Sequence, residues 1–480
     1  MTLKFGHIEN RLFLIGSSFF LLLMLLAMYL QLSLLLLLPI PLALIFIFLK
    51  DVRFAFYALM FSLPLSFQFL EKYDFPDEPL MILNSGFFLF FCLFNYRKIK
   101  LKSLLLHPLF IAVMLSVIWL TVTVILSKNS LLSAKFLLKK TWYIIPFFLW
   151  PIIFFQEKKV VIRSYQLLFS SLFVIVIVVL IRFSAVGFAF DRVHDPIQPF
   201  FQNHVMYGSM VSVTLPFVVA AFTLSRKLSI QWLISLAAIL FFLAGVYYSY
   251  SRAAWVAVIF AGGAYIAIRL KIMHWVILAF YVAVFALVFW LAKQNTYLSY
   301  KPKFEKTIMH ESIEDHIVAT IQGTDISSAE RYYRWIAALR MSTDNPVFGV
   351  GPNNFYDYYK PYTITSFRTW VSRNPERSTT HNYFLFMLVE QGIPALVLYA
   401  VLIFVVFFYG QKVLFRQKDR FSRTVVMSAM CCIAAVFINN FFSELLETDK
   451  IGSLFYLSIA VILAVDFASK QNSLTERPSA

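Results

Sequence analysis

The stretch "SRNPERSTTHNYFLFMLVEQGIPALVLY" (residues 372–399) changes from a basic, polar segment to an apolar one at His381. The apolar character then continues for almost thirty residues. A helix needs about 20 consecutive apolar residues to cross the hydrocarbon core of a bilayer. The stretch therefore predicts a membrane-spanning helix that begins with a histidine and follows a group of arginines.

Apolar runs of this kind recur along the whole chain. Of its 480 residues, 60% are hydrophobic and only 14% are charged. Soluble domains are about 45–50% apolar and about 25% charged, so the composition predicts an all-α polytopic membrane protein. We expect a single membrane domain (1–480) with about 12–14 transmembrane helices and one long connection, 293–380. The fourteen candidate spans are 12–30, 32–49, 53–70, 80–96, 106–126, 141–156, 164–181, 204–224, 228–248, 253–268, 273–292, 382–409, 425–441 and 451–467.

The lysine and arginine residues predict the orientation, because short cytoplasmic loops of membrane proteins are rich in them. If the N-terminus is cytoplasmic, 22 of the 42 lysines and arginines lie in cytoplasmic segments. Eleven of the others lie in the connection 293–380, which is too long for the rule to apply, and nine lie in short external connections. We therefore expect a cytoplasmic N-terminus and an external connection at 293–380.

This connection contains a helix signal of its own. In "SSAERYYRWIAALRMSTDNP" (327–346), Ser327 and Glu330 have the spacing of a capping box. The Asp-Asn-Pro sequence at its end is a helix stop signal. We therefore expect a helix here, followed by a tight turn at "FGVGPNNF" (348–355).

One face of this loop helix is a candidate anion site. Arg331, Arg334 and Trp335 stand at positions i, i+3 and i+4, which places two guanidinium groups beside an indole. Guanidinium groups bind phosphate through two parallel hydrogen bonds and keep their charge at any working pH. A solvated basic face would show the same spacing, so the spacing alone leaves both interpretations open.

Arg252 is a second candidate, in "YYSYSRAAWVAVIF" (247–260) between two predicted spans at the external boundary. An arginine at the centre of a bilayer costs about 2.5–3.5 kcal/mol on insertion scales, so arginines near this depth usually have a partner. The alternative is an arginine whose side chain extends to the membrane surface.

His381 opens a predicted span at its external end, within reach of the arginine-rich connection. Histidine is the usual general base near neutral pH. A helix cap or a structural hydrogen bond would also account for a histidine at this position. Since Arg252, Arg331 and His381 all lie on the predicted external side, together they could bind a diphosphate and activate a hydroxyl.

Three other groups of external residues give weaker signals. Tyr356 and Tyr359 could stack on sugar rings or belong to the aromatic belt at the membrane surface. The acidic segment "EKYDFPDEP" (71–79) could hold a divalent cation or form a solvated turn. In "HESIEDH" (310–316) the histidines are six residues apart, which is not the i, i+4 spacing of a helical zinc site. We expect no metal site and no cofactor.

Three segments taken together resemble a known family. "YSRAAWVAV" (250–258) is similar to its Ser-Arg-Gly/Ala-x-Trp motif. "ERYYRWIAALRMSTDNPVFGVGPNNF" (330–355) is similar to its Arg-x3-Trp and Pro-[Leu/Val]-Phe-Gly-x-Gly-Pro motifs. "THNYFLFMLVEQGIPALVLY" (380–399) is similar to its His-Asn-x-[Tyr/Phe]-Leu and Glu-x-Gly motifs. The family is the O-antigen ligase and O-antigen polymerase superfamily of bacterial inner-membrane glycan transferases, and the resemblance covers about residues 200–410.

The resemblance implies a GT-C-like fold and a transfer reaction. In this family a glycan on undecaprenyl diphosphate moves to an acceptor hydroxyl, on lipid A–core or a growing polysaccharide, at the periplasmic face. The diphosphate-binding arginines fall on Arg252 and Arg331, with Arg334 as an additional candidate, and the catalytic histidine falls on His381. The implied reaction inverts the anomeric carbon and uses no metal. The candidate glycan contacts are Trp335, Tyr356, Tyr359 and Asn382.

The sequence leaves three alternatives open. A polymerase of the same superfamily would use a second lipid-linked glycan as acceptor, and a protein-glycosylating member would use a protein. A polysaccharide transporter or flippase would have ionisable residues near the middle of its spans, whereas the candidates here lie at the external boundary. In each version the partners include membrane lipids and no nucleic acid.

Overall fold

A computed structural model describes residues 51–69, 73–95, 101–300, 326–367 and 379–475. The candidate spans 12–30 and 32–49, and the histidine pair of 310–316, lie outside the described residues. Within the described residues the only sheet is a short antiparallel hairpin of β1 (Phe67–Phe69) and β2 (Tyr73–Phe75). The rest of the regular structure is helical, which confirms the expected all-α fold.

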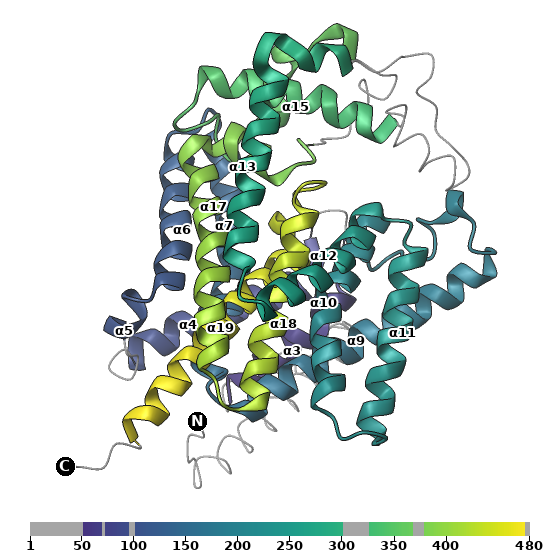
Figure 1. Ribbon diagram of the computed structural model, residues 1–480, viewed down its shortest axis with the longest axis vertical. Helices are drawn as coiled ribbons and strands as arrows, with labels where there is room; N and C mark the ends of the chain where they lie inside the picture. Colours follow the sequence, from purple (N-terminus) through teal and green to yellow (C-terminus); the bar gives the residue numbers. More distant parts are fainter. Residues whose placement is uncertain (1–50, 70–72, 96–100, 301–325, 368–378, 476–480) are drawn as a thin grey trace, which may run out of the picture.

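Each of the other twelve predicted spans falls on a helix (Figure 1). Eleven helical segments of the described residues are long and apolar enough to cross a membrane, and α3 is a shorter apolar helix. The chain is therefore a multi-pass membrane protein. The helices of the membrane part are α3 (Arg53–Leu65), α4 (Asp77–Asn95), α5 (Leu101–Leu105), α6 (Pro108–Ile125), α7 (Ser130–Ile144), α8 (Trp150–Phe154), α9 (Lys158–Ala185), α10 (His204–Leu224), α11 (Ile230–Tyr248), α12 (Arg252–Arg269), α13 (Met273–Ala292), α17 (Tyr383–Arg416), α18 (Arg420–Asn439) and α19 (Asp449–Thr475).

One predicted span, 141–156, begins earlier in the structure than expected. α7, a short π-helix and α8 form one continuous segment, Ser130–Phe154. Lysines interrupt the apolar pattern of α7 and concealed the first part of the span in the sequence. Lys140 is tolerated there because its amino group pairs with the carboxylate of Glu447 at 2.5 Å.

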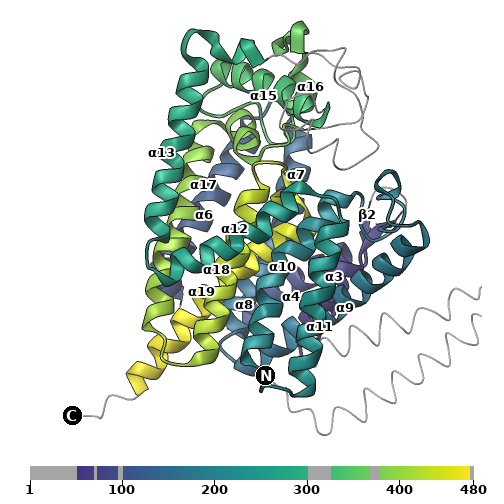
Figure 2. The ribbon, with the colours of Figure 1, turned by 45° about the vertical axis from the view of Figure 1, so that its right-hand side comes forward.

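Helices α10, α12, α18 and α19 pack side by side in the centre of the bundle (Figure 2). In the apolar membrane-spanning stretch of α19, 89% of the residues are buried. In that of α13, which lies at the edge of the bundle, 6% are buried. Ala429, Ala434 and Ala435 of α18 are fully buried. Small residues such as these let neighbouring helices approach closely, which is how helices associate in a membrane.

The connection between α13 and α17 folds against one end of this bundle. Its described part contains α15 (Ile326–Asp344), the short α16 (Phe355–Tyr358) and three 3-10 segments, Lys293–Tyr300, Lys360–Tyr362 and Thr365–Phe367. The predicted loop helix is thus confirmed, and it ends at the expected stop. α15 lies at the end of the molecule opposite the C-terminus (Figure 1).

A second hydrophobic core holds this connection on α17. Of its ten buried members, α15 supplies five, the segment between α15 and α17 supplies four, and α17 itself supplies one. The members include Tyr333, Ile336, Ala337, Met341, Val350, Phe355, Tyr359 and Val389. Because the core includes a residue of α17, α15 is positioned relative to the first turns of that helix.

The turn "FGVGPNNF" (348–355) is hydrogen-bonded to the backbone and side chains of α17. The backbone N–H of Val350 donates to the carbonyl of Val389 at 3.0 Å. The buried carboxylate of Glu390 accepts from the backbone N–H of Phe355 at 3.0 Å. These bonds explain why a glutamate can lie inside an apolar helix, since its side-chain oxygens accept hydrogen bonds from backbone donors.

Two glycines make this contact sterically feasible. Gly392 has a φ of +80° inside α17, and a Cβ atom there would collide with the carbonyl of Val347. Gly349 has a φ of +66°, and its Cβ would collide with the backbone of Glu390. Both positions therefore require the left-handed conformation and the small size of glycine.

Candidate functional site

His381 lies just before the first turn of α17 and has a φ of +51°, which is uncommon for a residue other than glycine. The next residue, Asn382, is the N-cap of α17, and its side-chain oxygen accepts from the N–H of Leu385 at 3.0 Å. The amide nitrogen of Asn382 donates to the carbonyl of Phe441 at 3.2 Å. The backbone after His381 is therefore fixed by α17 and by the end of α18.

The backbone before His381 is held by α15. The indole nitrogen of Trp335 donates to the carbonyl of Thr380 at 2.9 Å. The guanidinium of Arg334 donates to the carbonyl of Thr379 at 3.1 Å and lies 3.5 Å from the carboxylate of Glu330. Arg334 is only 8% exposed. These contacts make Arg334 and Trp335 positioning residues for the segment that carries His381.

Glu444, in the connection between α18 and α19, holds both neighbours of His381. One oxygen of its carboxylate accepts from the hydroxyl of Thr380 at 2.8 Å and from the backbone N–H of Asn382 at 3.2 Å. The segment that carries the imidazole is thus bound to a carboxylate on one element and to Arg334 and Trp335 of α15 on another.

The charges around His381 affect its protonation. Burial lowers the pKa of His381 below its ordinary value, because the charged imidazolium loses solvation. The carboxylate of Glu444 raises this pKa in opposition, while the guanidinium groups of Arg334 and Arg331 lower it. The lowered pKa keeps the imidazole neutral near pH 7, and a neutral imidazole can accept a proton.

Arg331 lies one turn before Arg334 on α15 and is partly exposed. Its charge lowers the pKa of His381. Its helix is bound to the segment before His381 through Arg334 and Trp335, so these two predicted site residues lie on elements in contact. The other arginines near His381 in the sequence, Arg368, Arg373 and Arg377, lie outside the described residues.

Arg252 is the first residue of α12 and is partly buried. The preceding Ser251 caps the helix by accepting from the N–H of Ala254 at 3.4 Å. Tyr250 has a φ of +50°, and its hydroxyl donates to the carbonyl of Phe188 at 2.8 Å. These bonds fix the turn before α12, and they therefore fix the backbone of Arg252.

A chain of contacts places Arg252 at the same end of the bundle as His381. α12 packs against α10 and α18. Near the start of α10, Ser209 donates to the side-chain oxygen of Asn439 at 3.1 Å. The next residue, Asn440, accepts from the backbone N–H of Tyr383 at 2.7 Å.

The four candidate glycan contacts differ in their exposure. Tyr359 is only 5% exposed and belongs to the core beneath α15, and Asn382 is 7% exposed and caps α17. We therefore assign these two to the framework of the site. Trp335 and Tyr356 are partly exposed and remain able to contact a sugar.

The described part of the acidic segment, 73–79, forms ion pairs with a lysine. The amino group of Lys139 lies 3.6 Å from Asp74, 3.3 Å from Glu78 and 3.3 Å from Asp449. These carboxylates could in principle ligate a cation, since their oxygens lie within 4.8 Å of one another. Lys139 supplies a positive charge beside all three carboxylates and forms an ion-pair network with them.

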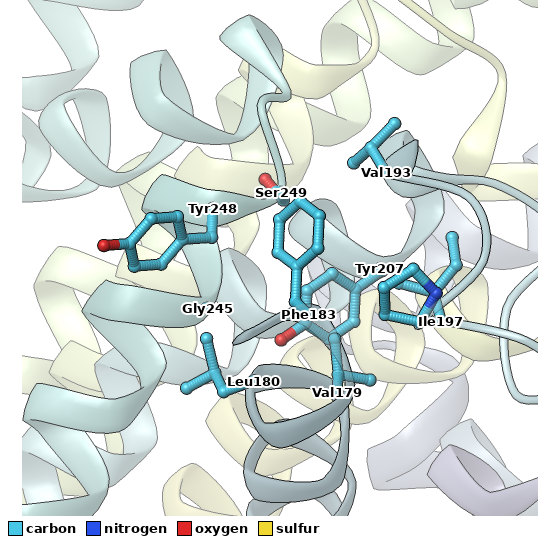
Figure 3. A pocket seen from close by; sticks show the side chains of 10 residues that line it. Val179, Leu180, Phe183, Val193, Ile197, Tyr207, Gly245, Tyr248 and Ser249 are labelled. Carbon is cyan, nitrogen blue, oxygen red and sulfur yellow. The ribbon is translucent and has the colours of Figure 1, made fainter. Parts of the chain in front are cut away.

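A small cavity lies close to the turn before α12. Figure 3 shows it between Phe183, Tyr207 and Ser249, and its volume is about 10 Å³. This volume holds about one water molecule. The cavity lies between α9, α10 and α11 and is far too small for a glycan or a diphosphate.

Glu444 and Thr380 are the site residues that the sequence did not indicate. Glu444 follows the span of α18 in "NFFSELLETD" (440–449), a short acidic connection on the predicted external side. The only available signal was an acidic residue at the same membrane boundary as His381, and no spacing links residues 64 positions apart.

Comparison with known families agrees with this geometry. Residues 236–400 match the family model described as O-antigen ligase. The match includes Arg252, the whole of α15 and His381. A search of curated protein sequences found no match to the chain. Residues 236–400 are therefore similar to the O-antigen ligase family, and the resemblance inferred from the three motifs is confirmed.

Proposed function

We propose that the protein transfers a glycan from a lipid-linked diphosphate to an acceptor hydroxyl at the end of the bundle that carries α15. The observation that carries this proposal is the hydrogen bonding around His381. Glu444 binds the residues on both sides of it, and Arg334 of α15 binds the segment before it, so a base, a carboxylate and a cationic helix lie together. The family match supports it, because it covers the arginine and the histidine.

In the proposed reaction Arg252 and Arg331 hold the diphosphate of the donor. Guanidinium groups suit this role because they form two hydrogen bonds to phosphate oxygens. As the bond between the anomeric carbon and the phosphate oxygen breaks, negative charge grows on the diphosphate, and the fixed cations stabilise it. The arginines supply the charge that a metal ion would otherwise provide.

His381 takes the proton from the acceptor hydroxyl. The hydroxyl oxygen attacks the anomeric carbon from the face opposite the diphosphate, so the product has the inverted configuration and the lipid diphosphate leaves. The resulting imidazolium is stabilised by Glu444, whose charge favours the protonated form. The lowered pKa of His381 keeps it neutral before the reaction, as a base must be.

The proposed donor is an undecaprenyl-diphosphate-linked glycan, and the proposed acceptor is lipid A–core or a growing polysaccharide. The α15 end faces the periplasm in this proposal, and the membrane is the bacterial inner membrane. An acceptor on lipid A–core makes the protein a ligase, and a second lipid-linked glycan makes it a polymerase.

The decisive experiment reconstitutes the purified protein in vesicles with the lipid-linked glycan and, separately, each acceptor. The product identifies the acceptor, and His381→Ala should reduce the rate roughly 10²–10⁴-fold, the usual contribution of general acid–base catalysis. Donor binding should persist in this variant, because the arginines are unchanged. Normal turnover of His381→Ala would contradict the mechanism, and movement of intact donor across the vesicle membrane would indicate a transporter.

A further inference from the structure

A cavity of about 680 Å³ lies at the end of the bundle opposite His381. It is bounded by the last turns of α10 and α12, the end of α17 and the first turns of α18, whereas His381 precedes the beginning of α17. Its volume lies within the range of about 300–1,000 Å³ that is typical of small-molecule sites. The lining includes Leu215, Val219, Ala261, Gly262, Lys418 and Arg423.

The interior of this cavity is largely apolar, and it exists because α12 contributes small residues there. Ala261 and Gly262 of α12 line it together with Leu215 and Val219 of α10. A Cβ atom added at Gly262 would meet no atom within 4 Å. A longer side chain at this position would therefore extend into the cavity without colliding with a neighbouring residue.

The rim of the cavity is cationic. Arg269 ends α12, and Lys418, Arg420 and Arg423 lie at the junction of α17 and α18. Among the described residues that line the cavity there is no aspartate or glutamate. The nearby carboxylate of Asp419 caps α18, where it accepts from the N–H of Ser422 at 2.9 Å. The rim thus concentrates positive charge beside an apolar interior.

A ligand that fits has an anionic head and a long apolar chain. Guanidinium and ammonium groups bind phosphate strongly, and basic pockets between transmembrane helices bind the phosphate head groups of anionic lipids. We propose that this cavity binds an anionic phospholipid of the adjacent leaflet, with an acyl chain between α10 and α12 and the phosphate at Lys418 and Arg423.

A polyisoprenyl phosphate has related chemistry, but its head group would belong at the other end of the bundle. Under the proposed function, the diphosphate of the donor binds near His381, whereas the cationic rim of this cavity lies at the far ends of the same helices. An abundant membrane phospholipid presents its phosphate at either surface of the bilayer, so it can reach this rim without entering the catalytic cycle.

Two pairs of variants test the site in the full-length protein. Gly262→Leu fills the cavity, and Gly263→Leu is the matched control because a Cβ at Gly263 also meets nothing within 4 Å but this residue does not line the cavity. Lys418→Gln with Arg423→Gln removes two charges from the rim. Arg226→Gln with Lys227→Gln removes two charges from the connection between α10 and α11 and serves as its control.

Binding is measured on delipidated protein in a neutral detergent by native mass spectrometry, with phosphatidylglycerol, phosphatidylcholine and undecaprenyl phosphate as separate probes. The wild type and both controls should bind one phosphatidylglycerol. Gly262→Leu and the Lys418/Arg423 double variant should bind it about tenfold more weakly or worse, the loss expected for a charge-assisted hydrogen bond or more.

Equal phosphatidylglycerol binding by all variants would overturn the proposal, as would equally strong binding of phosphatidylcholine by the wild type. Preferential binding of undecaprenyl phosphate, lost in the same variants, would instead assign the cavity to the carrier lipid. Because the filled-cavity and charge variants act independently, a folding defect in one of them leaves the other to decide.

Discussion

The carboxylate of Glu444 accepts a hydrogen bond from the hydroxyl of Thr380 at 2.8 Å, across 64 residues of sequence. The same oxygen accepts from the backbone N–H of Asn382 at 3.2 Å. The residues on both sides of His381 are therefore bound to one carboxylate. This arrangement gives Glu444 two effects on the imidazole, because it fixes the backbone and raises the pKa of His381 through its charge.

Glu444→Gln separates these two effects, since glutamine keeps the shape and removes the charge. A carboxylate favours the imidazolium, so its removal should lower the pKa of His381 further. The acidic limb of the pH–rate profile should then move to lower pH, and the maximal rate should fall roughly tenfold, about the contribution of one charge-assisted hydrogen bond. The measurement is the transfer rate from pH 4 to pH 8, a range that includes the ordinary pKa of histidine, about 6.5.

Asp357→Asn is the control for this change, because Asp357 is exposed on α16. An unchanged acidic limb in Glu444→Gln, with a lower rate at every pH, would show that Glu444 only positions the backbone.

Arg331→Lys should be severely impaired although the positive charge is kept. Lysine cannot form the two parallel hydrogen bonds that a guanidinium makes with a phosphate. Loss of one transition-state hydrogen-bond donor typically costs about 10²–10³-fold in rate, and we expect a decrease in kcat/KM of this size. Arg340→Lys is the matched control, because Arg340 lies on the exposed face of the same helix. Equal activity of the two variants would remove Arg331 from the diphosphate site.

Gly392→Ala should detach the turn 348–355 from α17. Gly392 has a φ of +80°, and an alanine Cβ would collide with the carbonyl of Val347. The left-handed conformation alone costs a non-glycine residue roughly 1–2 kcal/mol. We expect a lower Tm in detergent and faster proteolysis of the connection between α13 and α17.

Gly86→Ala provides the comparison, since Gly86 lies inside α4 and a Cβ there meets nothing within 4 Å. This variant should keep the Tm of the wild type or exceed it, because alanine favours a helix more than glycine does. A Tm for Gly392→Ala equal to that of Gly86→Ala would contradict the steric argument.

Much of the fold could be predicted because it depends on local composition. The apolar runs located the spans of the described residues, and the stop sequence at 344–346 located the end of α15. The sequence also predicts that Arg252 and His381 lie at the same membrane boundary, because consecutive spans cross the membrane in opposite directions.

The remaining parts of the site depend on tertiary packing. Arg334 and Arg331 share the same residue type and the same helix, yet Arg334 is buried against the carbonyl of Thr379. Likewise, Tyr359 lies in a tyrosine-rich segment but belongs to the core. Glu444 meets His381 because the end of α18 adjoins the start of α17. The spacing of residues in the sequence does not predict tertiary contacts of this kind.

A chelator should leave the transfer rate unchanged, because the proposed mechanism uses arginines to neutralise the diphosphate. Asp74→Asn should also keep most of the activity, since Lys139 retains Glu78 and Asp449 at 3.3 Å each. The assay compares the reconstituted protein with and without ethylenediaminetetraacetate. Inhibition that is reversed by a divalent cation and reproduced by Asp74→Asn would transfer the chemistry to the acidic cluster.

The orientation of the membrane domain decides whether the site faces its proposed substrates. His381 and α15 lie at one end of the bundle, and the basic junction of α17 and α18 lies at the other. Since basic residues favour the cytoplasmic side, the α15 end should be periplasmic. An alkaline phosphatase fused after Asn345, which is active only outside the cytoplasm, should be active, and a fusion after Lys227 should be inactive. The opposite pattern would place His381 in the cytoplasm, where the proposed periplasmic acceptors could not reach it.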